Sequence, residues 1–437
     1  MNKVISLLKR NPDLDSKTII NILRVDKNYL LDIYKNIQNS PNIQNDIINN
    51  SLSPRFTIET SNLISQHSKY ISDILLGKVY FPKILEFHSG MFCQCSCPFC
   101  FSNGYQYPKY LTGELPITTK VVEKIFSECR GNGVEEIWFS GGKESLTNSL
   151  TPDFIEIAND LGLKTRLYTN AIAINSSNVN KLTLCYQIRV SFNGIGAQNY
   201  KLLHFPNVSS LLIEHMYEKV LANIELLVNS KNKLSRECSI GLNIIIQPAN
   251  YNKIIELAQI ANNFGVDSIH IRREVMKQTI ALSMNEIASI SSQIFKVRKL
   301  FPNLIVDARG FDEGEFYTNN TQFLPGLKQP ELCRAGLIKR GLSAWGQVFS
   351  CEFSEHPRFQ AEYSDHLLGN INNESISEIF RKNVNNFPKV CKLCQAHEYG
   401  LNIAFEKLKN DLDFGIAIEE QPLYVKKKLI DEETNEK

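Results

Sequence analysis

Short apolar runs and amphipathic segments alternate through the middle of the chain. Each run has the length and composition of a strand, and each amphipathic segment repeats its apolar residues at the spacing of one helix face. The predicted strands cover residues 83–87, 134–139, 165–169, 187–192, 240–246 and 268–272. The predicted helices cover residues 117–130, 154–161, 213–228, 254–264 and 285–300. This alternation predicts a parallel α/β sheet wound by right-handed crossovers, and a half or three-quarter barrel fits it best.

The segments on either side of this alternation have a different character. Residues 1–82 have no glycine before Gly77 and carry apolar residues at helical spacing, which predicts a helical N-terminal region. The alternation of strands and helices ends after a last strand-like run at residues 304–307. Residues 316–437 are rich in loops and contain four cysteines. We therefore expect a barrel domain at residues 83–315 and a small C-terminal domain at residues 316–437.

Composition and charge narrow the class of protein. Of the 437 residues, 43% are hydrophobic, and 48 Lys and Arg against 46 Asp and Glu leave a net charge of +2. The hydrophobic fraction is enough to form folded cores. The near-equal numbers of positive and negative residues give no excess of positive charge of the kind that binds nucleic acid. Because no apolar run reaches the roughly 18 residues of a membrane helix, and Lys9 and Arg10 interrupt the first apolar patch, we expect a cytoplasmic protein with no membrane partner. Eleven cysteines, an odd count, favour metal or redox chemistry over a disulfide framework.

Four of these cysteines lie in one loop directly after the first predicted strand. Cys93, Cys97 and Cys100 have three and then two residues between them, so their thiolates can converge on one metal centre. Three thiolates can hold a 4Fe-4S cluster with one iron open to a small chelating molecule. Zinc is the alternative, because Cys95 can complete a set of four thiolates.

A CxxxCxxC loop after the first strand of a β/α series resembles the radical S-adenosylmethionine (SAM) superfamily. The resemblance implies a partial (β/α)6 barrel in which the three cysteines hold the cluster and the open iron binds SAM. Phe99 stands where the family has an aromatic residue beside the adenine. After the second strand, Ser140-Gly141-Gly142-Lys143-Glu144-Ser145-Leu146 is similar to the family's SGGGEPL turn, which implies SAM contacts from Gly141, Gly142 and Glu144. Lys143 replaces a glycine. Because a positive φ would strain it, we expect either an ordinary φ there or a functional reason for a positive one.

Two further segments resemble the family at later strand ends. Residues 168–170 are similar to the family's YTNG, with Ala171 in place of the glycine, and residues 189–194 are similar to RVSLDG. The second likeness implies that Ser191 and Asn193 contact SAM. Asn243 and Arg272, on the fifth and sixth strands, are weaker candidate cofactor contacts, since a charged cluster at a strand end is usually solvated. No catalytic acid, base or hydrogen donor is marked by the sequence.

The C-terminal segment contains a second group of cysteines. Cys333, Cys351, Cys391 and Cys394 come from separate parts of the chain, and their spacing suits a zinc ribbon or a 4Fe-4S centre equally well. The surrounding sequence resembles the twitch and SPASM extensions of radical SAM enzymes. A full SPASM domain needs further cysteines after Cys394, so we expect one auxiliary 4Fe-4S cluster, with structural zinc as the alternative.

The resemblance implies an enzyme that forms a 5'-deoxyadenosyl radical from SAM and abstracts a substrate hydrogen atom. Modification of a ribosomally made peptide is the first functional hypothesis, a small-molecule dehydrogenase is the second, and a non-catalytic zinc scaffold is the third. A flavodoxin- or ferredoxin-type electron donor is implied as a partner. The N-terminal helical region can either grip a peptide leader or cap the barrel.

Overall fold

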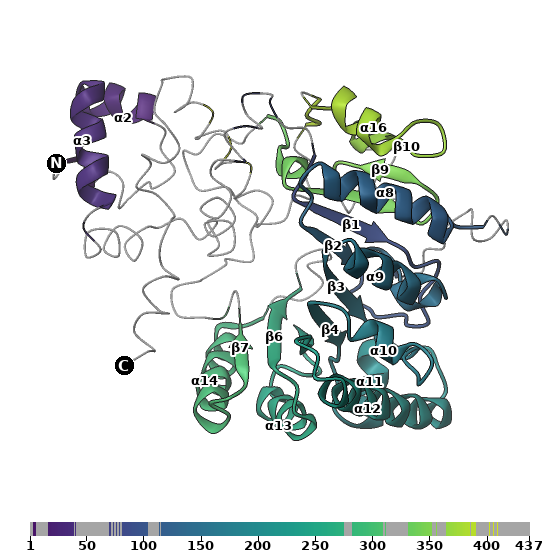
Figure 1. The fold of residues 1–437 in the computed structure, drawn as a ribbon. Coiled ribbons are helices and arrows are strands. Elements are labelled where there is room, and N and C mark those ends of the chain that lie inside the picture. Colours follow the sequence, from purple (N-terminus) through teal and green to yellow (C-terminus); the bar gives the residue numbers. More distant parts are fainter. Residues whose placement is uncertain are drawn as a thin grey trace. The chain divides into compact units, whose positions relative to one another are not determined.

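A computed structural model describes most of the barrel and parts of its flanks (Figure 1). The described residues are 3–5, 16–38, 40, 70, 73, 76, 78, 81–103, 113, 115–274, 282–308, 311, 331–351, 355, 364–384, 386–389, 402, 405 and 409. The chain divides into two compact units. One comprises Met1–Tyr80, Phe316–Ala335 and Asn383–Lys437, and the other comprises Phe81–Glu315 and Gly336–Lys382.

The second unit is built on one ten-stranded sheet in the order β10-β9-β8-β1-β2-β3-β4-β5-β6-β7. Strands β1 to β7 pair in parallel with their sequence neighbours, and β8 pairs in parallel with β1. Strands β8, β9 and β10 form an antiparallel edge. The bounds are β1 (Ile84–His88), β2 (Glu136–Phe139), β3 (Lys164–Thr169), β4 (Gln187–Ser191), β5 (Ser239–Ile246), β6 (Ser268–Arg273), β7 (Ile305–Asp307), β8 (Lys339–Ser343), β9 (Gln347–Phe349) and β10 (Leu367–Asn370).

Helices follow the parallel strands and lie along the outer face of the curved sheet (Figure 1). They are α8 (Thr119–Gly131), α9 (Thr151–Asp160), α10 (Val179–Leu182), α11 (Gly196–His204), α12 (Ser210–Lys233), α13 (Ile254–Phe264), α14 (Met284–Leu300) and α16 (Ile376–Lys382), with short 3-10 turns η1 (Ser145–Thr147), η2 (Ala335–Leu337) and η4 (Ser364–His366). The alternation of parallel strands and helices is the partial-barrel α/β class that the sequence predicts, so the fold-class prediction is confirmed.

The two faces of the sheet differ in chemistry because alternate residues of a strand point to opposite sides. Phe87 on β1 points to the helices, and its ring lies 6.1 Å from Phe126, 5.9 Å from Phe139 and 5.4 Å from Phe154. Burial of each such ring contributes about 1.5 to 3 kcal/mol to the free energy of folding. Glu86 on the same strand takes the opposite direction and receives a hydrogen bond from Ser140. The outer face therefore holds the core, and the inner face is left for polar chemistry.

Several elements in the second unit were not predicted from the sequence: the antiparallel edge and the helices α10, α11 and α16. Residues 339–370 were expected in the C-terminal domain, but β8 pairs with β1 from Ile84↔Lys339 to His88↔Ser343 and so joins the barrel sheet. The polar strand Lys-Arg-Gly-Leu-Ser lacks a period-two apolar pattern, and its pairing partner lies far away in sequence. A strand with these two properties cannot be predicted from a local sequence pattern.

The first unit contains two described helices, α2 (Ser16–Leu23) and α3 (Lys27–Gln38), where the sequence predicts a helical N-terminal region. Ile19, Leu30 and Ile33 are buried in it. In the same unit, Leu332 forms an antiparallel bridge with Lys389. Within the described part of the whole chain, no helix combines the length and apolar character needed to cross a membrane.

Candidate metal centre at the end of β1

The cysteine loop leaves the carboxyl end of β1 and is held by bonds from two other elements. Glu144 N–H donates to Phe92 O at 3.1 Å, and Ser96 N–H donates to His204 O at 2.8 Å. Inside the loop, Cys100 N–H donates to Cys97 O at 3.0 Å. The second strand end and the end of α11 thus fix the loop, and its four cysteines are all partly buried.

The thiols in this loop interact with one another. Hydrogen bonds from Cys95 lower the pKa of Cys93, and they lower the pKa of Cys97 well below its ordinary value, aided there by His204. The same bonds raise the pKa of Cys95 well above its ordinary value, while burial raises the pKa of Cys100 to about 11. The thiolate, which is the form that binds metal, is therefore more accessible at Cys93 and Cys97 than at Cys95 and Cys100.

A third element, α11, brings a histidine to this loop. His204 is 1% exposed, and its Nδ1 lies 3.4 Å from Cys97 Sγ. Donor atoms of Cys95, Cys97 and His204 all lie within 4.8 Å of one another, which is close enough to hold one metal ion. His204 was not predicted as a site residue, because α11 has no strong apolar period and the similarity to the family motif ends before this helix.

Hydrogen bonds fix which ring nitrogen of His204 carries the proton. Asn193 Oδ1 accepts from Ile245 N–H at 2.6 Å, so the amide nitrogen of Asn193 is the atom that faces His204 Nε2, at 3.3 Å. Asn193 N–H also points to Nε2, at 3.3 Å. With two donors on Nε2, that nitrogen must accept, and Nδ1–H then donates to Cys97 Sγ.

Two glycines allow the turn after β2 to approach the cysteine loop. A Cβ at Gly90 would lie 2.3 Å from the Glu144 carbonyl oxygen, and a Cβ at Gly141 would lie 2.2 Å from the His88 ring. Gly141 also has φ +102°. Lys143 is not among the described residues with positive φ, so its expected ordinary conformation is confirmed, and its Nζ donates to Ser102 O at 3.3 Å.

Glu144 lies at the centre of this turn with 5% exposure. Its Oε1 accepts from Thr169 Oγ1 at 2.6 Å and from Leu146 N–H at 3.2 Å, and its Oε2 accepts from Asn170 N–H at 2.7 Å. Burial raises the pKa of Glu144, and these hydrogen bonds partly offset the shift. The carboxylate therefore ties the second strand end to the third, and Oε2 keeps capacity for one further donor.

Ala171 occupies the position where the similar family motif has a glycine. It has φ +63° and is fully buried, and Asn223 Nδ2 donates to its carbonyl oxygen at 2.8 Å. The left-handed backbone that the motif requires is therefore kept without the glycine, at a strain of about 1 to 2 kcal/mol.

The remaining predicted cofactor residues fall into two groups. Ser191 and Asn243 are register partners on β4 and β5, are partly exposed, and have no side-chain hydrogen bond to any described residue. Phe99 is partly exposed in the cysteine loop. Asn193 is instead 1% exposed and engaged on His204 and Ile245, and Arg272 is paired with Asp307. The first three are available for a ligand, whereas the last two already have protein partners.

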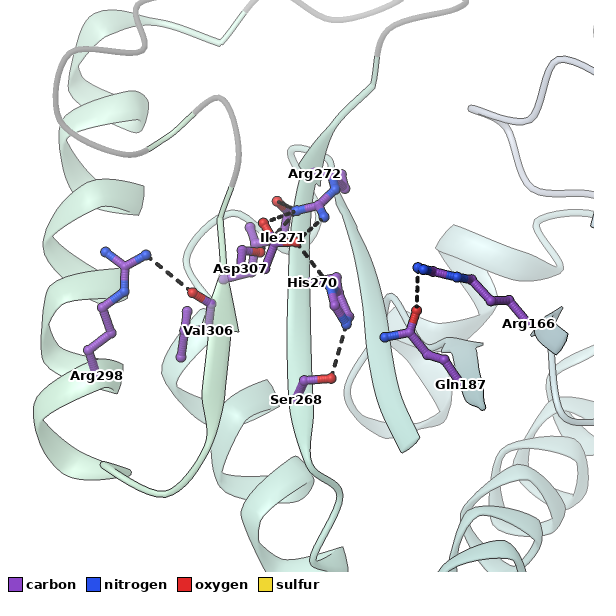
Figure 2. A network of polar contacts seen from close by, with 9 residues as sticks. All are labelled: Arg166, Gln187, Ser268, His270, Ile271, Arg272, Arg298, Val306 and Asp307. Carbon is purple, nitrogen blue, oxygen red and sulfur yellow. Dashed lines mark hydrogen bonds and ion pairs between the residues drawn. The ribbon is translucent and has the colours of Figure 1, made fainter. Parts of the chain in front are cut away.

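A polar network lines β6 and β7 on the inner face (Figure 2). Ser268 Oγ lies 3.0 Å from His270 Nε2, and His270 Nδ1 lies 3.2 Å from Asp307 Oδ2. Arg272 donates to both oxygens of Asp307, at 3.0 and 2.5 Å. Although burial alone would raise it, the pKa of Asp307 is held well below its ordinary value by hydrogen bonds from His270 and the charge of Arg272. Burial lowers the pKa of His270, so its ring is neutral at pH 7.

The surroundings of Tyr200 indicate whether a metal cluster with a bound ligand fits the site. Its ring stacks on His204 with centroids 4.4 Å apart, and its hydroxyl is buried without a hydrogen-bond partner among the described residues. Burial, and then the charges of Cys95 and Cys97, raise the pKa of this hydroxyl. An orphaned hydroxyl beside soft thiolate donors fits a metal cluster and its ligand at this place.

The second group of predicted metal ligands is described only in part. Cys333 is buried in the first unit, where Asn402 Nδ2 donates to its Sγ at 3.5 Å and its N–H donates to Pro388 O at 2.7 Å. Cys351 follows β9 in the second unit. Cys391 and Cys394 lie outside the described residues.

The fold is the partial barrel that the resemblance to the radical SAM superfamily implies, and solved structures with a similar fold support it. The structure of Streptococcus suis SuiB bound to S-adenosylmethionine is similar to it with a TM-score of 0.51 and 16% identity, over 72% of this chain and 68% of that one. SuiB bound to the precursor peptide SuiA is similar with a TM-score of 0.51 and 15% identity, over 72% and 69%. At this identity the likeness shows the fold.

Two curated proteins are similar in sequence. The PqqA peptide cyclase of Bradyrhizobium diazoefficiens is 31% identical over 106 residues, which cover 24% of this chain and 26% of that protein. The dTDP-4-amino-4,6-dideoxy-D-glucose ammonia-lyase of Streptomyces venezuelae is 21% identical over 210 residues, which cover 46% and 41%. The chain thus matches less than half the length of either relative. No protein-family model matches the sequence.

Proposed function

We propose that this chain is a radical SAM enzyme that modifies a ribosomally made peptide. The observation that carries the chemistry is the loop of Cys93, Cys97 and Cys100 at the end of β1, with the buried Glu144 beside it. Ser191 and Asn243, whose side chains have no hydrogen bond to a described residue, form a register pair on the later strands β4 and β5. Cys93, Cys97 and Cys100 would hold a 4Fe-4S cluster, which would supply the electron for cleavage of SAM to methionine and a 5'-deoxyadenosyl radical that abstracts a substrate hydrogen atom.

The chain's own residues would position SAM. Glu144 Oε2 has room to accept from the amine of SAM, and the Gly141-Gly142 turn leaves backbone exposed beside it. Ser191 and Asn243 offer a hydroxyl and an amide one strand apart for the ribose or carboxylate, and Phe99 offers a ring for the adenine. The polar inner face of the barrel then surrounds the substrate and excludes water from the radical.

A peptide substrate is supported by two of the relatives. SuiB is bound to a precursor peptide in one structure, and the PqqA peptide cyclase acts on a peptide. The match to a sugar-nucleotide ammonia-lyase supports a small-molecule substrate as the second candidate. In either case, the electron comes from a flavodoxin- or ferredoxin-type donor.

We also propose one auxiliary 4Fe-4S cluster on Cys333, Cys351, Cys391 and Cys394. The support is local: the bridge from Leu332 to Lys389 joins the residue before Cys333 to a residue two positions before Cys391. Replacing Cys391 and Cys394 together with Ala should remove about half of the iron and leave some SAM cleavage. Loss of zinc instead of iron would identify a structural zinc site.

Anaerobic purification followed by iron, sulfide and zinc analysis tests the proposal. We expect iron and acid-labile sulfide, and reductive SAM cleavage that Cys97→Ala abolishes. Cys129→Ala is the matched control, because Cys129 is a fully buried residue of α8, outside the cysteine loop, and its replacement should leave cleavage intact. Zinc without iron would make Cys95, Cys97 and His204 a structural site and contradict the proposal.

The substrate class needs a separate measurement. The reduced enzyme and SAM are incubated with short peptides encoded beside the gene, and the products are analysed by mass spectrometry. Loss of two hydrogens, deuterium uptake or a cross-link in a peptide supports the proposal. Substrate-dependent 5'-deoxyadenosine with a sugar or other metabolite, and none with any peptide, would support the small-molecule candidate.

A further inference from the structure

Three arginines that influence one another line the inner face of the barrel, and two of them have carboxylate partners. Arg166 on β3 donates from Nε to Glu136 Oε2 at 2.8 Å and from Nη2 to Glu136 Oε1 at 3.1 Å. Arg272 on β6 forms the two-pronged pair with Asp307. Arg189, on β4 between them, has no hydrogen bond or ion pair to any residue that the structure describes, and its Nε is buried.

The surroundings of Arg189 do not neutralise it. Its guanidinium carbon lies 5.5 Å from the centre of the Tyr168 ring, which is its register neighbour on β3. Burial, and then the charges of Arg272 and Arg166, lower the pKa of Arg189, while Tyr168 and Asp307 act in the opposite direction. A guanidinium still keeps its proton at pH 7. The three arginines and two carboxylates therefore leave one positive charge in excess.

The buried part of such a charge carries a desolvation cost, so charges that lose solvent in proteins are normally paired. Arg189 is partly exposed, but its Nε is buried and it has no carboxylate partner among the described residues. An arginine held in this way on the inner face is a feature that a ligand can explain. One excess charge matches one carboxylate, and the planar fork of arginine suits that group.

We propose that Arg189 binds a carboxylate of the substrate inside the barrel. This inference rests on the proposed function and specifies its substrate: the peptide presents an acidic side chain or its C-terminal carboxylate. The carboxylate of SAM is the other source of the same chemistry. We assign the site to the substrate because Ser191 and Asn243 form a register pair two residues further toward the cysteine loop on the same face. They carry polar side chains with no hydrogen bond to a described residue, which suits them to SAM, whereas Arg189 lies two residues earlier on β4.

The first test measures stability without substrate. The full-length, anaerobically reconstituted chain is compared with Arg189→Met and with Arg166→Met, the control at an arginine that has a partner. Arg189→Met should have a thermal midpoint equal to or above that of the parent, because it removes a partly buried charge that has no partner among the described residues. Arg166→Met should lower the midpoint, because it removes the charged partner of Glu136 and leaves that carboxylate only the hydrogen bond from Trp138 Nε1. A drop for Arg189→Met as large as that for Arg166→Met would overturn the proposal.

The second test uses acetate as the carboxylate probe, with chloride at equal ionic strength and acetamide as the neutral analogue. Acetate should raise the midpoint of the parent above both references, with at least a tenfold weaker apparent affinity in Arg189→Met and an intermediate affinity in Arg189→Lys. Equal acetate effects in the parent and Arg189→Met would overturn the proposal.

SAM affinity is measured on the same reconstituted proteins. A tenfold loss of SAM affinity in Arg189→Met would also overturn the proposal, because the site would then bind the carboxylate of SAM. The acetate effects on the parent and on the variants can also be measured with protein that binds no iron. Failure of the carboxylate site and failure of the proposed radical SAM function can therefore be distinguished.

Discussion

His204 Nδ1 lies 3.4 Å from Cys97 Sγ, and the proton on that nitrogen is fixed by Asn193 on the far side of the ring. An aspartate at position 193, as in the similar family motif, could not donate its side chain to His204 Nε2. The departure from the motif and the histidine on α11 therefore form one arrangement. It directs an N–H donor at a sulfur that we propose as a cluster ligand.

His204→Leu should make the midpoint potential of the SAM-binding cluster more negative. Hydrogen bonds to a ligand sulfur stabilise the added electron of the reduced cluster, so removal of one disfavours reduction. An EPR-monitored redox titration of the signal that changes when SAM is added measures this potential. His204→Asn, which can place an amide N–H near Nδ1, should restore it in part. His215→Leu, on the exposed side of α12, is the control and should leave it unchanged. Equal potentials in all variants, with full iron content, would show that His204 only packs the loop.

Glu144→Gln should weaken SAM binding at least about tenfold, because a hydrogen bond to a charged group contributes about 1.5 to 3 kcal/mol. Calorimetric titration of the reconstituted protein with SAM measures the change. Thr169→Val is the matched control: it removes one hydrogen bond to Glu144 Oε1 and keeps the carboxylate. The same loss of affinity in both variants would mean that Glu144 acts by shaping the turn.

Much of this arrangement could be predicted from local sequence. Strands β1 to β7 follow from apolar runs, and the SGGKESL segment lies at the end of β2 as expected, beside the cysteine loop. Cys129, Cys185 and Cys238 are buried thiols, as packed side chains would be.

What the sequence could not show depends on long-range pairing. Strand β8 is polar in pattern and is buried because β1 lies beside it. Arg189 belongs to a segment similar to the family motif. That it has no ion-pair partner among the described residues is seen only when Glu136 and Asp307 are found paired with other arginines. Contacts between residues far apart in sequence decide both cases.

Gly90→Ala should disrupt the site, because its Cβ would fall 2.3 Å from a backbone oxygen that has no free rotation. We expect a loss of about 3 kcal/mol in the free energy of unfolding, the upper end for an overpacked position, together with lower iron content. Gly131→Ala, at the end of α8, meets nothing within 4 Å and should be neutral or slightly stabilising. Denaturant unfolding of both variants measures the difference. A neutral Gly90→Ala with normal iron would contradict the close approach of the two loops.

Glu355→Gln should destabilise the barrel in a pH-dependent way. Glu355 pairs with His88 at the end of β1, and both side chains are at most 3% exposed. Burial alone would lower the pKa of His88, but the charge and hydrogen bond of Glu355 outweigh it and raise that pKa above its ordinary value. A raised histidine pKa contributes stability that is complete below the unfolded value of about 6.5 and is lost as pH rises through the folded-state value.

The variant should therefore lose about 3 kcal/mol of unfolding free energy near pH 6, the cost of breaking a buried ion pair, and this loss should shrink as the pH rises. Unfolding curves from pH 5.5 to 9 measure it. Glu374→Gln, which removes an ion pair with the exposed Lys382, should change stability little at any pH. If the unfolding free energy lost in Glu355→Gln instead grows as the pH rises, the prediction is contradicted. That result would show that His88 is neutral when Glu355 is present.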